Sequence, residues 1–286
     1  MKAAVKADLL ALAAIALWGS LAALGVELAH VPPFLLTGWG LLLGSLIALP
    51  LSRGRLSLWR VPLKTLLVGI YGLFGFHFLL FMALRHAPAV EANLVNYLWP
   101  LGMVVMAPLF LKDMRWQARH VVAALVGFAG AATAILGQSS ASSEVVVFHS
   151  GYLLALASAF VWASYSLMTR RLPHFPTAAV GGFALASGLL SLVCHAWLEP
   201  AVALSSKDWL LIGLLGLGPL GGAFFLWDAA IKLGDTRRIG LLAFATPILS
   251  TVTLLLTTGQ PLHGHVVIAA VLVVGAAWWG SKQPLT

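Results

Sequence analysis

The sequence predicts an all-α integral membrane protein of ten transmembrane helices, arranged as two inverted five-helix repeats around a central cavity. Three observations predict this fold: ten apolar stretches, a one-sided distribution of basic residues between them, and an internal repeat. Of the 286 residues, 60% are hydrophobic and 9% are charged. Soluble domains carry roughly a quarter of charged residues, so this composition excludes a soluble globular protein.

Each apolar stretch is long enough to cross a bilayer as a helix, which takes about 20 residues. The stretches lie at 7–28, 34–51, 63–84, 89–111, 118–136, 150–170, 177–198, 208–232, 238–258 and 264–281. The first stretch is longer than the apolar part of a secretory signal, and Glu27 and Pro32 follow it in place of a small-residue cleavage site. We therefore interpret it as a retained span.

Lys and Arg residues gather in alternate gaps between these stretches. Of the 17 basic residues, only Arg85 and Lys207 lie in the odd-numbered gaps, whereas the even-numbered gaps and the two termini hold the others. Because positively charged loops stay in the cytoplasm, we expect both termini to be cytoplasmic. Topology then explains the formal net charge of +8 without a nucleic-acid partner.

The second half of the chain repeats the first half. Trp18 aligns with Trp162 at an offset of 144 residues, and Pro100 aligns with Pro247 at an offset of 147 residues. Because each half holds five spans, an odd number, the second half starts on the other side of the membrane and is an inverted copy of the first. Inverted repeats are typical of secondary transporters, and the alternative is an ancient duplication without mechanistic consequence.

The repeat also predicts the domain organisation. We expect the first five-helix repeat over 1–137, a Ser-rich polar linker over 138–149 and the second, inverted repeat over 150–286. No gap approaches the ~50 residues that a separate soluble domain needs, so we expect the function to lie within the membrane.

At this level the chain resembles the drug/metabolite transporter superfamily, whose ten-span members consist of two EamA-type halves. The string NYLWP at 96–100, preceded by EANLV at 91–95, is similar to the fourth-helix motif of the YddG-type subgroup of aromatic amino acid exporters. The resemblance implies a multi-pass protein of the bacterial inner (plasma) membrane. It also implies export of aromatic amino acids and related metabolites from the cytoplasm through a central cavity.

Polar and aromatic residues share one face of the fourth span. Asn93, Asn96 and Tyr97 are spaced at i, i+3 and i+4, and Trp99 follows them. Amides are costly to expose to lipid, so we expect this face to contact substrate or water. The alternative is that the asparagines join helix to helix through hydrogen bonds.

Aromatic residues recur in the third, sixth and eighth spans. Trp162, Tyr165 and Ser166 share a face of the sixth span, which aligns with the span that contains Trp18. Aromatic walls suit an aromatic or aliphatic substrate, because ring pairs contribute ~0.5–1.5 kcal/mol beyond area burial. The alternative for the phenylalanines is packing or lipid contact. The candidate substrate-binding residues are Trp18, His77, Phe78, Phe81, Asn93, Asn96, Tyr97, Trp99, Trp162, Tyr165, Ser166, Phe224, Trp227, Asp228 and Phe244.

Two prolines and two ionisable residues have two interpretations each. Pro100 and Pro247 are candidate hinges, and the alternative is a pair of static kinks. Asp228 stands four residues before Lys232, so it either faces substrate or forms an interfacial ion pair. His77 is the one deep ionisable candidate for a proton relay, and the alternative is a neutral packing partner.

These observations predict an alternating-access exporter of aromatic and other neutral amino acids and related small metabolites. Because no carboxylate lies at the centre of a predicted span, we expect facilitated export. The alternative is export of another small metabolite or drug within the same superfamily, with proton coupling. We expect a monomeric carrier with a small-molecule substrate, surrounded by membrane lipids.

The sequence lacks the motifs of an intramembrane enzyme. It contains neither H-E-x-x-H nor G-x-S-x-G, so we expect no enzymatic activity. Cys194 is the single cysteine, and His263 and His265 have no third ligand beside them, so we expect no disulfide, no metal and no cofactor. A channel would need rings of charge or carbonyl-rich loops, which are not evident.

Overall fold

Helices form all the regular secondary structure of the residues that the computed structural model describes, which are 2–112, 114–136, 149–259 and 264–281. Within them, nine helical segments are long and apolar enough to cross a membrane, and a shorter apolar helix covers Gly264–Gly280. Ten spans are predicted from the sequence; the all-helical fold is confirmed, and the described residues contain nine to ten apolar helices. The predicted linker lies, apart from His149, outside the described residues.

The first half of the chain forms five apolar spans, several of which consist of more than one helix. Its helices are α1 (Lys2–Gly19), α2 (Leu21–Glu27), α3 (Pro33–Ser45), α4 (Ala48–Leu51), η1 (Leu56–Trp59), α5 (Leu63–Ile70), η2 (Tyr71–Gly75), α6 (Phe76–His86), α7 (Ala89–Asn96), α8 (Trp99–Phe110) and α9 (Ala118–Leu136). Prolines open several of them, because proline needs no amide partner in a first helical turn.

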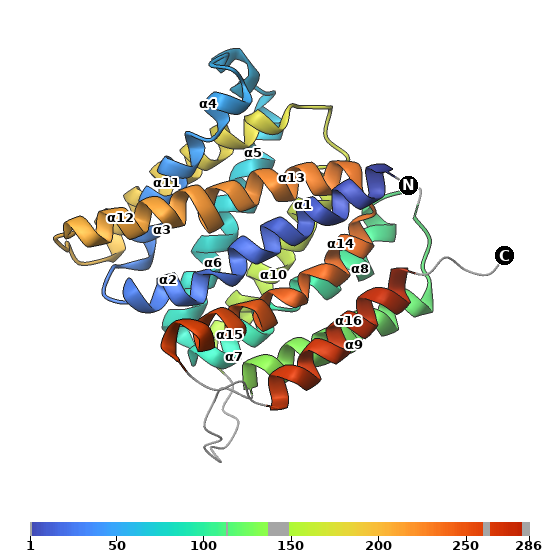
Figure 1. The fold of residues 1–286 in the computed structure, drawn as a ribbon. Coiled ribbons are helices and arrows are strands. Elements are labelled where there is room, and N and C mark those ends of the chain that lie inside the picture. The colour runs from blue at the N-terminus through green and yellow to red at the C-terminus, as the bar shows by residue number, and fades with distance from the viewer. Residues whose placement is uncertain (1, 113, 137–148, 260–263, 282–286) are drawn as a thin grey trace.

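The second half forms four further apolar spans and the shorter apolar helix. Its helices are α10 (Gly151–Met168), η3 (Thr177–Ala179), α11 (Val180–Leu198), α12 (Ser206–Leu217), η4 (Gly218–Gly222), α13 (Ala223–Leu233), α14 (Thr236–Ala243), α15 (Ala245–Thr258) and α16 (Gly264–Ser281). Figure 1 shows that α1 begins and α16 ends on the same side of the bundle.

Helices from the two halves pack side by side throughout the bundle. Helix α3 packs against α11, α1 against α13, α6 against α10, and α9 against α16 at one edge (Figure 1). Glycines allow the closest approaches, since a Cβ atom on Gly44 of α3 would lie 2.7 Å from the carbonyl oxygen of Gly216 in α12. The two halves therefore share one interior instead of forming separate bodies.

The third and eighth spans are interrupted in the same way. Tyr71–Gly75 forms a π-helical turn between α5 and α6, and Gly218–Gly222 forms another between α12 and α13. Both turns, and the helices α6 and α13 that follow them, are offset by 147 residues, and so are α7 and α14. Pro219 has no amide hydrogen to donate, so the regular hydrogen-bond ladder cannot continue through the second turn.

One end of the bundle, called the basic end below, is held together by arginine contacts. Arg238 Nη2 forms an ion pair with Asp8 Oδ2 of α1 at 2.7 Å. Arg170 Nη1 donates a hydrogen bond to the carbonyl oxygen of Gly234 at 2.7 Å. These contacts join α14 to α1, and the loop between α13 and α14 to the end of α10.

The other end of the bundle, called the opposite end below, is organised around Glu199, whose side chain is 1% exposed. Its carboxylate accepts hydrogen bonds from the backbone N–H groups of Phe34 and Leu35 at 2.9 and 3.2 Å, and these groups begin α3. It also pairs with Arg85 at 3.1 Å and His195 at 3.0 Å. A carboxylate at a helix N-terminus is stabilised by the helix dipole, so Glu199 fixes α3, α6 and α11 together.

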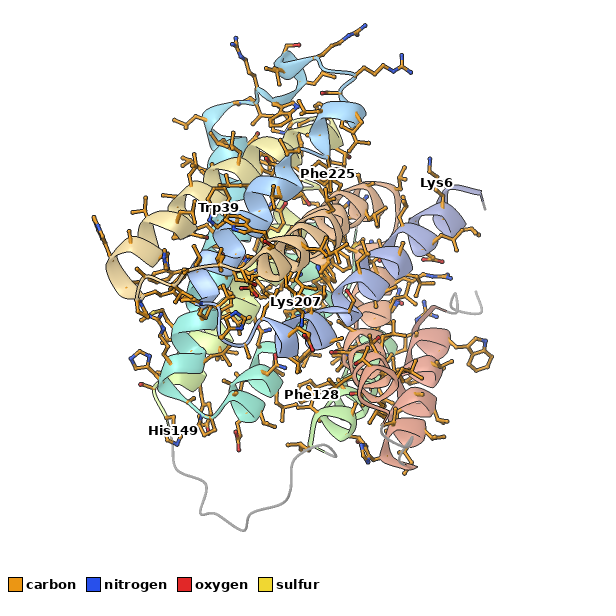
Figure 2. All side chains as sticks on the ribbon, turned by 60° about the vertical axis from the view of Figure 1, so that its left-hand side comes forward. Lys6, Trp39, Phe128, His149, Lys207 and Phe225 are labelled. Carbon is orange, nitrogen blue, oxygen red and sulfur yellow. The ribbon has the colours of Figure 1, made fainter. Side chains whose placement is uncertain are left out.

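The two halves enter the bundle from different ends. Helix α1 begins at the basic end, whereas Gly151, the first residue of α10, packs against the backbone of Ala83 near the opposite end. Figure 2 shows the same separation between Lys6 of α1 and His149, which precedes α10.

Candidate functional site: a central aromatic cavity

A cavity of about 380 Å³ lies between the two halves of the molecule. Its lining residues are Trp18, Leu21, Leu36, Thr37, Phe76, His77, Leu80, Phe81, Asn93, Asn96, Tyr97, Trp99, Trp162, Leu215, Leu220, Phe224, Thr246 and Ser250. Pockets that bind small molecules have volumes of this order and a similar mixture of apolar walls and a few polar groups.

The lining residues become more buried from the opposite end toward the basic end. Helix α7 begins close to Arg85 at the opposite end, and its Asn93 is exposed, whereas Tyr97 is half-buried and Trp99 is 5% exposed. Similarly, Phe81 is half-buried and Trp18 is buried. The cavity thus has its exposed part toward the opposite end and its floor toward the basic end.

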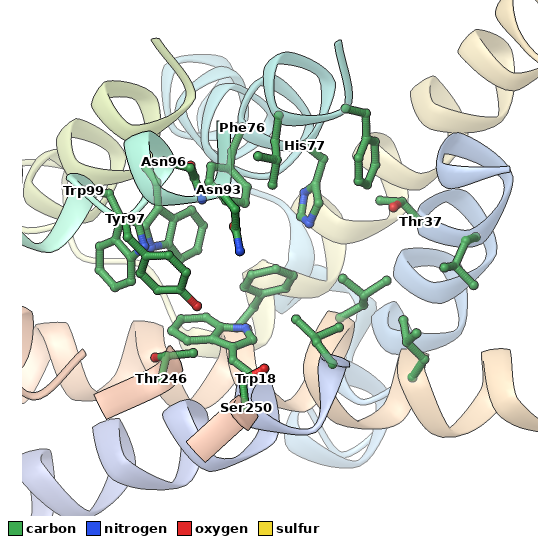
Figure 3. Close-up of a pocket in the computed structure, with 18 residues that line it drawn as sticks. Trp18, Thr37, Phe76, His77, Asn93, Asn96, Tyr97, Trp99, Thr246 and Ser250 are labelled. Carbon is green, nitrogen blue, oxygen red and sulfur yellow. The ribbon is translucent and has the colours of Figure 1, made fainter. Parts of the chain in front are cut away.

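Uncharged polar groups project into the cavity from two sides. Figure 3 shows Asn93 of α7 and Tyr97, the residue after α7, on one side and Thr246 and Ser250 of α15 on the other. The described residues that line the cavity include no Lys, Arg, Asp or Glu. The cavity therefore offers hydrogen-bond donors and acceptors without a permanently charged side chain.

Two buried polar residues of the lining have fixed partners. Asn96 Oδ1 accepts a hydrogen bond from Ser158 Oγ of α10 at 2.7 Å, so Asn96 both joins two helices and faces the cavity. His77 Nδ1 lies 2.6 Å from the carbonyl oxygen of Leu73. Because a carbonyl can only accept, this ring nitrogen donates, and in the neutral ring Nε2 is then an acceptor.

Four aromatic rings of the lining form the floor of the cavity, and Trp227 packs behind them. We call these five rings the tryptophan cluster: Trp18, Trp99, Trp162, Phe224 and Trp227. The centroid distances are 5.1 Å between Trp18 and Trp227, 5.8 Å between Trp18 and Trp162, 5.6 Å between Trp162 and Phe224, and 5.6 Å between Trp99 and Trp227. Edge-to-face and tilted pairs at these distances are the favoured aromatic geometries. The floor is consequently a packed aromatic layer contributed by both halves.

Hydrogen bonds orient two indoles of the tryptophan cluster. Trp18 Nε1 donates to the carbonyl oxygen of Pro219 at 3.1 Å, and this carbonyl belongs to the π-helical turn η4, where the helical ladder is interrupted. Trp227 Nε1 donates to Ser166 Oγ at 3.1 Å. A buried indole N–H needs a partner, so these contacts fix the orientation of each ring.

A buried ion pair lies in α13 one residue beyond the tryptophan cluster, on the side of the basic end. Asp228 Oδ2 accepts hydrogen bonds from Lys232 Nζ and Thr177 Oγ1, both at 2.7 Å. Lys232 Nζ also donates to the carbonyl oxygen of Phe175 at 3.0 Å and lies 3.5 Å from the centre of that ring. The contacts tie α13 to the start of the seventh span.

Comparison with known proteins identifies the family to which this chain belongs. The model of the EamA-like transporter family matches the chain twice, over residues 5–136 and 149–280. The chain belongs to the EamA-like transporter family. It is therefore a multi-pass membrane transporter and not an enzyme.

Individual relatives cover nearly the whole of this EamA-like transporter. The chain is 41% identical to the aromatic amino acid exporter YddG of Ancylobacter novellus over 274 residues, which cover 95% of each chain. It is 28% identical to the protein of the same name from Salmonella typhimurium, with coverage of 97% of this chain and 98% of the relative. A crystal structure with 40% sequence identity matches it with a TM-score of 0.89, covering 96% of this chain and 95% of that one.

The transporter brings together at its cavity most of the candidate residues predicted from the sequence. Those that line the cavity are Trp18, His77, Phe81, Asn93, Asn96, Tyr97, Trp99, Trp162 and Phe224. The i, i+3, i+4 spacing accounts for three of them, because Asn93 and Asn96 of α7 and Tyr97 directly after it all line the cavity.

The other candidate residues lie away from the cavity. Tyr165, Ser166 and Trp227 lie behind its wall, and Asp228 lies toward the basic end. Phe78 faces the rings of Phe34 and Phe74, both at 5.7 Å, because it lies on another side of α6 from His77 and Phe81. Phe244 packs against Gly127 in the cluster formed by α9 and α16.

The two candidate hinge prolines occupy equivalent positions where a span restarts. Pro100 lies in the first turn of α8, after the break between α7 and α8, and Pro247 lies in the first turn of α15, after Phe244. Thr246 Oγ1 donates to the carbonyl oxygen of Ala243 at 2.8 Å. This carbonyl is the i−4 acceptor of residue 247, and proline leaves it available to the hydroxyl.

Half of the lining was not predicted from the sequence. The missed residues are Leu21, Leu36, Thr37, Phe76, Leu80, Leu215, Leu220, Thr246 and Ser250. Thr246 aligns with Trp99 at the offset of 147 residues, so the repeat contained a signal for its position. The leucines gave no such signal, because the sequence pattern of a leucine that faces a cavity does not differ from that of a leucine that faces lipid.

Proposed function

We propose that this transporter exports aromatic and other neutral amino acids and related small metabolites from the cytoplasm. The observation that carries the proposal is a cavity with an aromatic floor, uncharged polar walls and no permanently charged lining residue in the described chain. Aromatic walls hold an aromatic or aliphatic side chain, and the amide and hydroxyl groups can orient the polar end of the molecule. The name of the 41% identical relative, an aromatic amino acid exporter, supports the same substrate class.

We further propose that the two halves are inverted repeats and that transport proceeds by alternating access. Two features support the inversion: equivalent π-helical turns separated by 147 residues, and helices α1 and α10 that begin at different ends of the bundle. Two copies of one structure in opposite orientation can exchange their conformations, which moves the opening of the cavity from one end to the other.

The orientation in the membrane follows from the charges. The basic end carries the Lys- and Arg-rich loops, so we propose that it faces the cytoplasm of a bacterial cell, together with both termini. The cavity described above would then face the outside of the inner membrane, with the tryptophan cluster closing the path to the cytoplasm.

Facilitated transport is the energetic mode that we propose. His77 carries the one imidazole among the described residues that line the cavity, and its Nδ1 is hydrogen-bonded to the carbonyl oxygen of Leu73. A proton-coupled carrier commonly uses a carboxylate or histidine as a relay, so His77 is the residue that coupling would require.

The test is transport of radiolabelled phenylalanine, tryptophan, methionine and threonine into liposomes that contain the purified protein, with and without a pH gradient. We expect saturable flux of the aromatic substrates that does not respond to the gradient. Accumulation driven by the gradient would contradict facilitated transport. The variant His77→Gln would then test whether His77 relays the proton. Absence of flux for all four would contradict amino acid export.

A further inference from the structure

Asp228 and Lys232 form the buried charge pair nearest to the tryptophan cluster, and the proposed transport path does not yet use it. The Asp228 side chain is 1% exposed and that of Lys232 is 20% exposed. Asp228 Oδ2 accepts two hydrogen bonds, whereas Oδ1 is buried and has no hydrogen-bond partner among the described residues. A buried carboxylate oxygen without a donor is destabilising by roughly 1–3 kcal/mol unless a ligand or solvent molecule supplies one.

A second carboxylate with a buried side chain makes the contrast clear. Glu199 at the opposite end accepts hydrogen bonds from Phe34, Leu35, Arg85 and His195 and is absent from the buried atoms without partners in the described chain. Its environment is that of a structural residue. Asp228 is instead left with a free acceptor in the interior.

The internal repeat relates Asp228 to the cavity. On α6, His77, Leu80 and Phe81 line the cavity, and at the offset of 147 residues they correspond to Phe224, Trp227 and Asp228 on α13. If the halves exchange conformations, the side of α13 that carries Asp228 lines a cavity open to the basic end, as α6 lines the present one. Asp228 would then stand where Phe81 stands now, at the wide part of that cavity.

We propose that Asp228 and Lys232 form a second substrate subsite at the basic end, in which Asp228 binds the ammonium group and Lys232 the carboxylate of an amino acid. This inference rests on the proposed function. It adds two charged groups that bind the charges of the substrate, whereas the described lining of the cavity has no Lys, Arg, Asp or Glu. An amino acid carries its two opposite charges on one carbon, so it can insert between the members of an ion pair and satisfy both. Lys232 keeps its contact with the Phe175 ring while it does so.

The charge pair makes the two ends of the path chemically different. Substrate would meet a charged subsite when the basic end is open and an uncharged cavity when the opposite end is open. The expected consequence is tighter binding of zwitterions from the basic side, with discrimination against analogues that lack one of the two charges.

The test measures competition by two analogues of phenylalanine in the liposome assay, with each analogue present on both sides. Phenylethylamine retains the ammonium group, and 3-phenylpropanoate retains the carboxylate. For Asp228→Asn we expect the concentration of phenylethylamine that halves phenylalanine flux to rise about tenfold, since a hydrogen bond to a charged group is lost, while that of 3-phenylpropanoate does not rise. Lys232→Gln should show the reverse pattern.

Asp8→Asn is the matched control, because it makes the same charge change at the same end and breaks the ion pair with Arg238. We expect it to leave both half-inhibitory concentrations within about twofold of the wild type, because Asp8 lies in neither the cavity nor the proposed subsite. If the ratio of the half-inhibitory concentrations of phenylethylamine and 3-phenylpropanoate is the same in Asp228→Asn and Lys232→Gln as in the wild type, the proposal is overturned. The ion pair would then have a structural role alone. Loss of phenylalanine flux in the wild type would instead contradict the proposed function.

A single substitution could leave an unpaired buried charge and prevent folding, so the double variant Asp228→Asn/Lys232→Gln removes both charges together. Thermal stabilisation of the purified protein by each analogue provides a readout that does not depend on transport. We expect each analogue to stabilise the double variant less than the wild type, and equal stabilisation of the two proteins would contradict the subsite.

Discussion

Trp162 of α10 packs against several other aromatic rings beside the cavity. Its ring lies 5.8 Å from Trp18, 6.3 Å from Trp99 and 5.6 Å from Phe224, and it is 3% exposed. At the scale of single residues, the floor of the cavity therefore depends on this side chain. It lines the cavity and also packs against the other rings of the tryptophan cluster.

Trp162→Ala should lower the flux of tryptophan and phenylalanine by about tenfold, because several ring pairs of ~0.5–1.5 kcal/mol each are lost together with the floor. The liposome assay measures this effect. Trp197→Ala is the control, since Trp197 is 84% exposed on the surface of α11 and should leave flux unchanged. Equal fluxes in the two variants would show that the floor does not contact substrate.

At the scale of elements, the interruptions of the spans present groups to the site that an uninterrupted helix could not present. The π-helical turn at Gly218–Gly222 presents the Pro219 carbonyl to Trp18, and the break before α15 presents Thr246 to the cavity. Each interruption thus serves a residue of the site. The repeat places an equivalent interruption in the first half.

Pro247→Ala should lower the maximal transport rate about threefold or more while leaving the half-saturation concentration of phenylalanine nearly unchanged. The new amide would compete with Thr246 for the Ala243 carbonyl and let the helix run straight through the proposed hinge. Pro108→Ala, in the interior of α8, is the control. An unchanged rate would identify Pro247 as a static kink.

At the scale of the whole molecule, few charged contacts hold the ends of the helices together. Glu199 joins three helices at the opposite end, and both halves contribute to its partners. Apolar side chains gain little by leaving a hydrocarbon solvent, so the hydrophobic effect contributes little to helix association within the bilayer. A buried carboxylate with several partners provides part of that attraction instead.

Glu199→Gln should lower the midpoint of thermal unfolding in detergent by about 5 °C or more, since removing one member of a buried charge network leaves Arg85 without its partner. The size-exclusion profile of heated samples measures this midpoint. Glu91→Gln removes an exposed carboxylate of α7 and should shift the midpoint little. Similar shifts in both variants would contradict the structural role of Glu199.

The fold was more predictable from the sequence than the site. Apolar length and the separation of basic residues depend on the bilayer alone, so they are visible without any partner helix. Within the site, Asn93 and Tyr97 could be predicted because a polar group is unusual in lipid. Leu215 and Leu220 could not, since hydrophobic contrast does not distinguish a cavity-facing leucine from a lipid-facing one.

The tryptophan cluster also gives the transporter a built-in optical reporter. Indole emission shifts with the polarity around the ring, and Trp18, Trp99 and Trp162 line the space that a substrate would enter. A ligand seated on them would displace water and change the emission spectrum, whereas Trp197, which is 84% exposed on α11, would contribute a constant background. Occupancy could thus be followed without a label, in the same preparation that is used for flux.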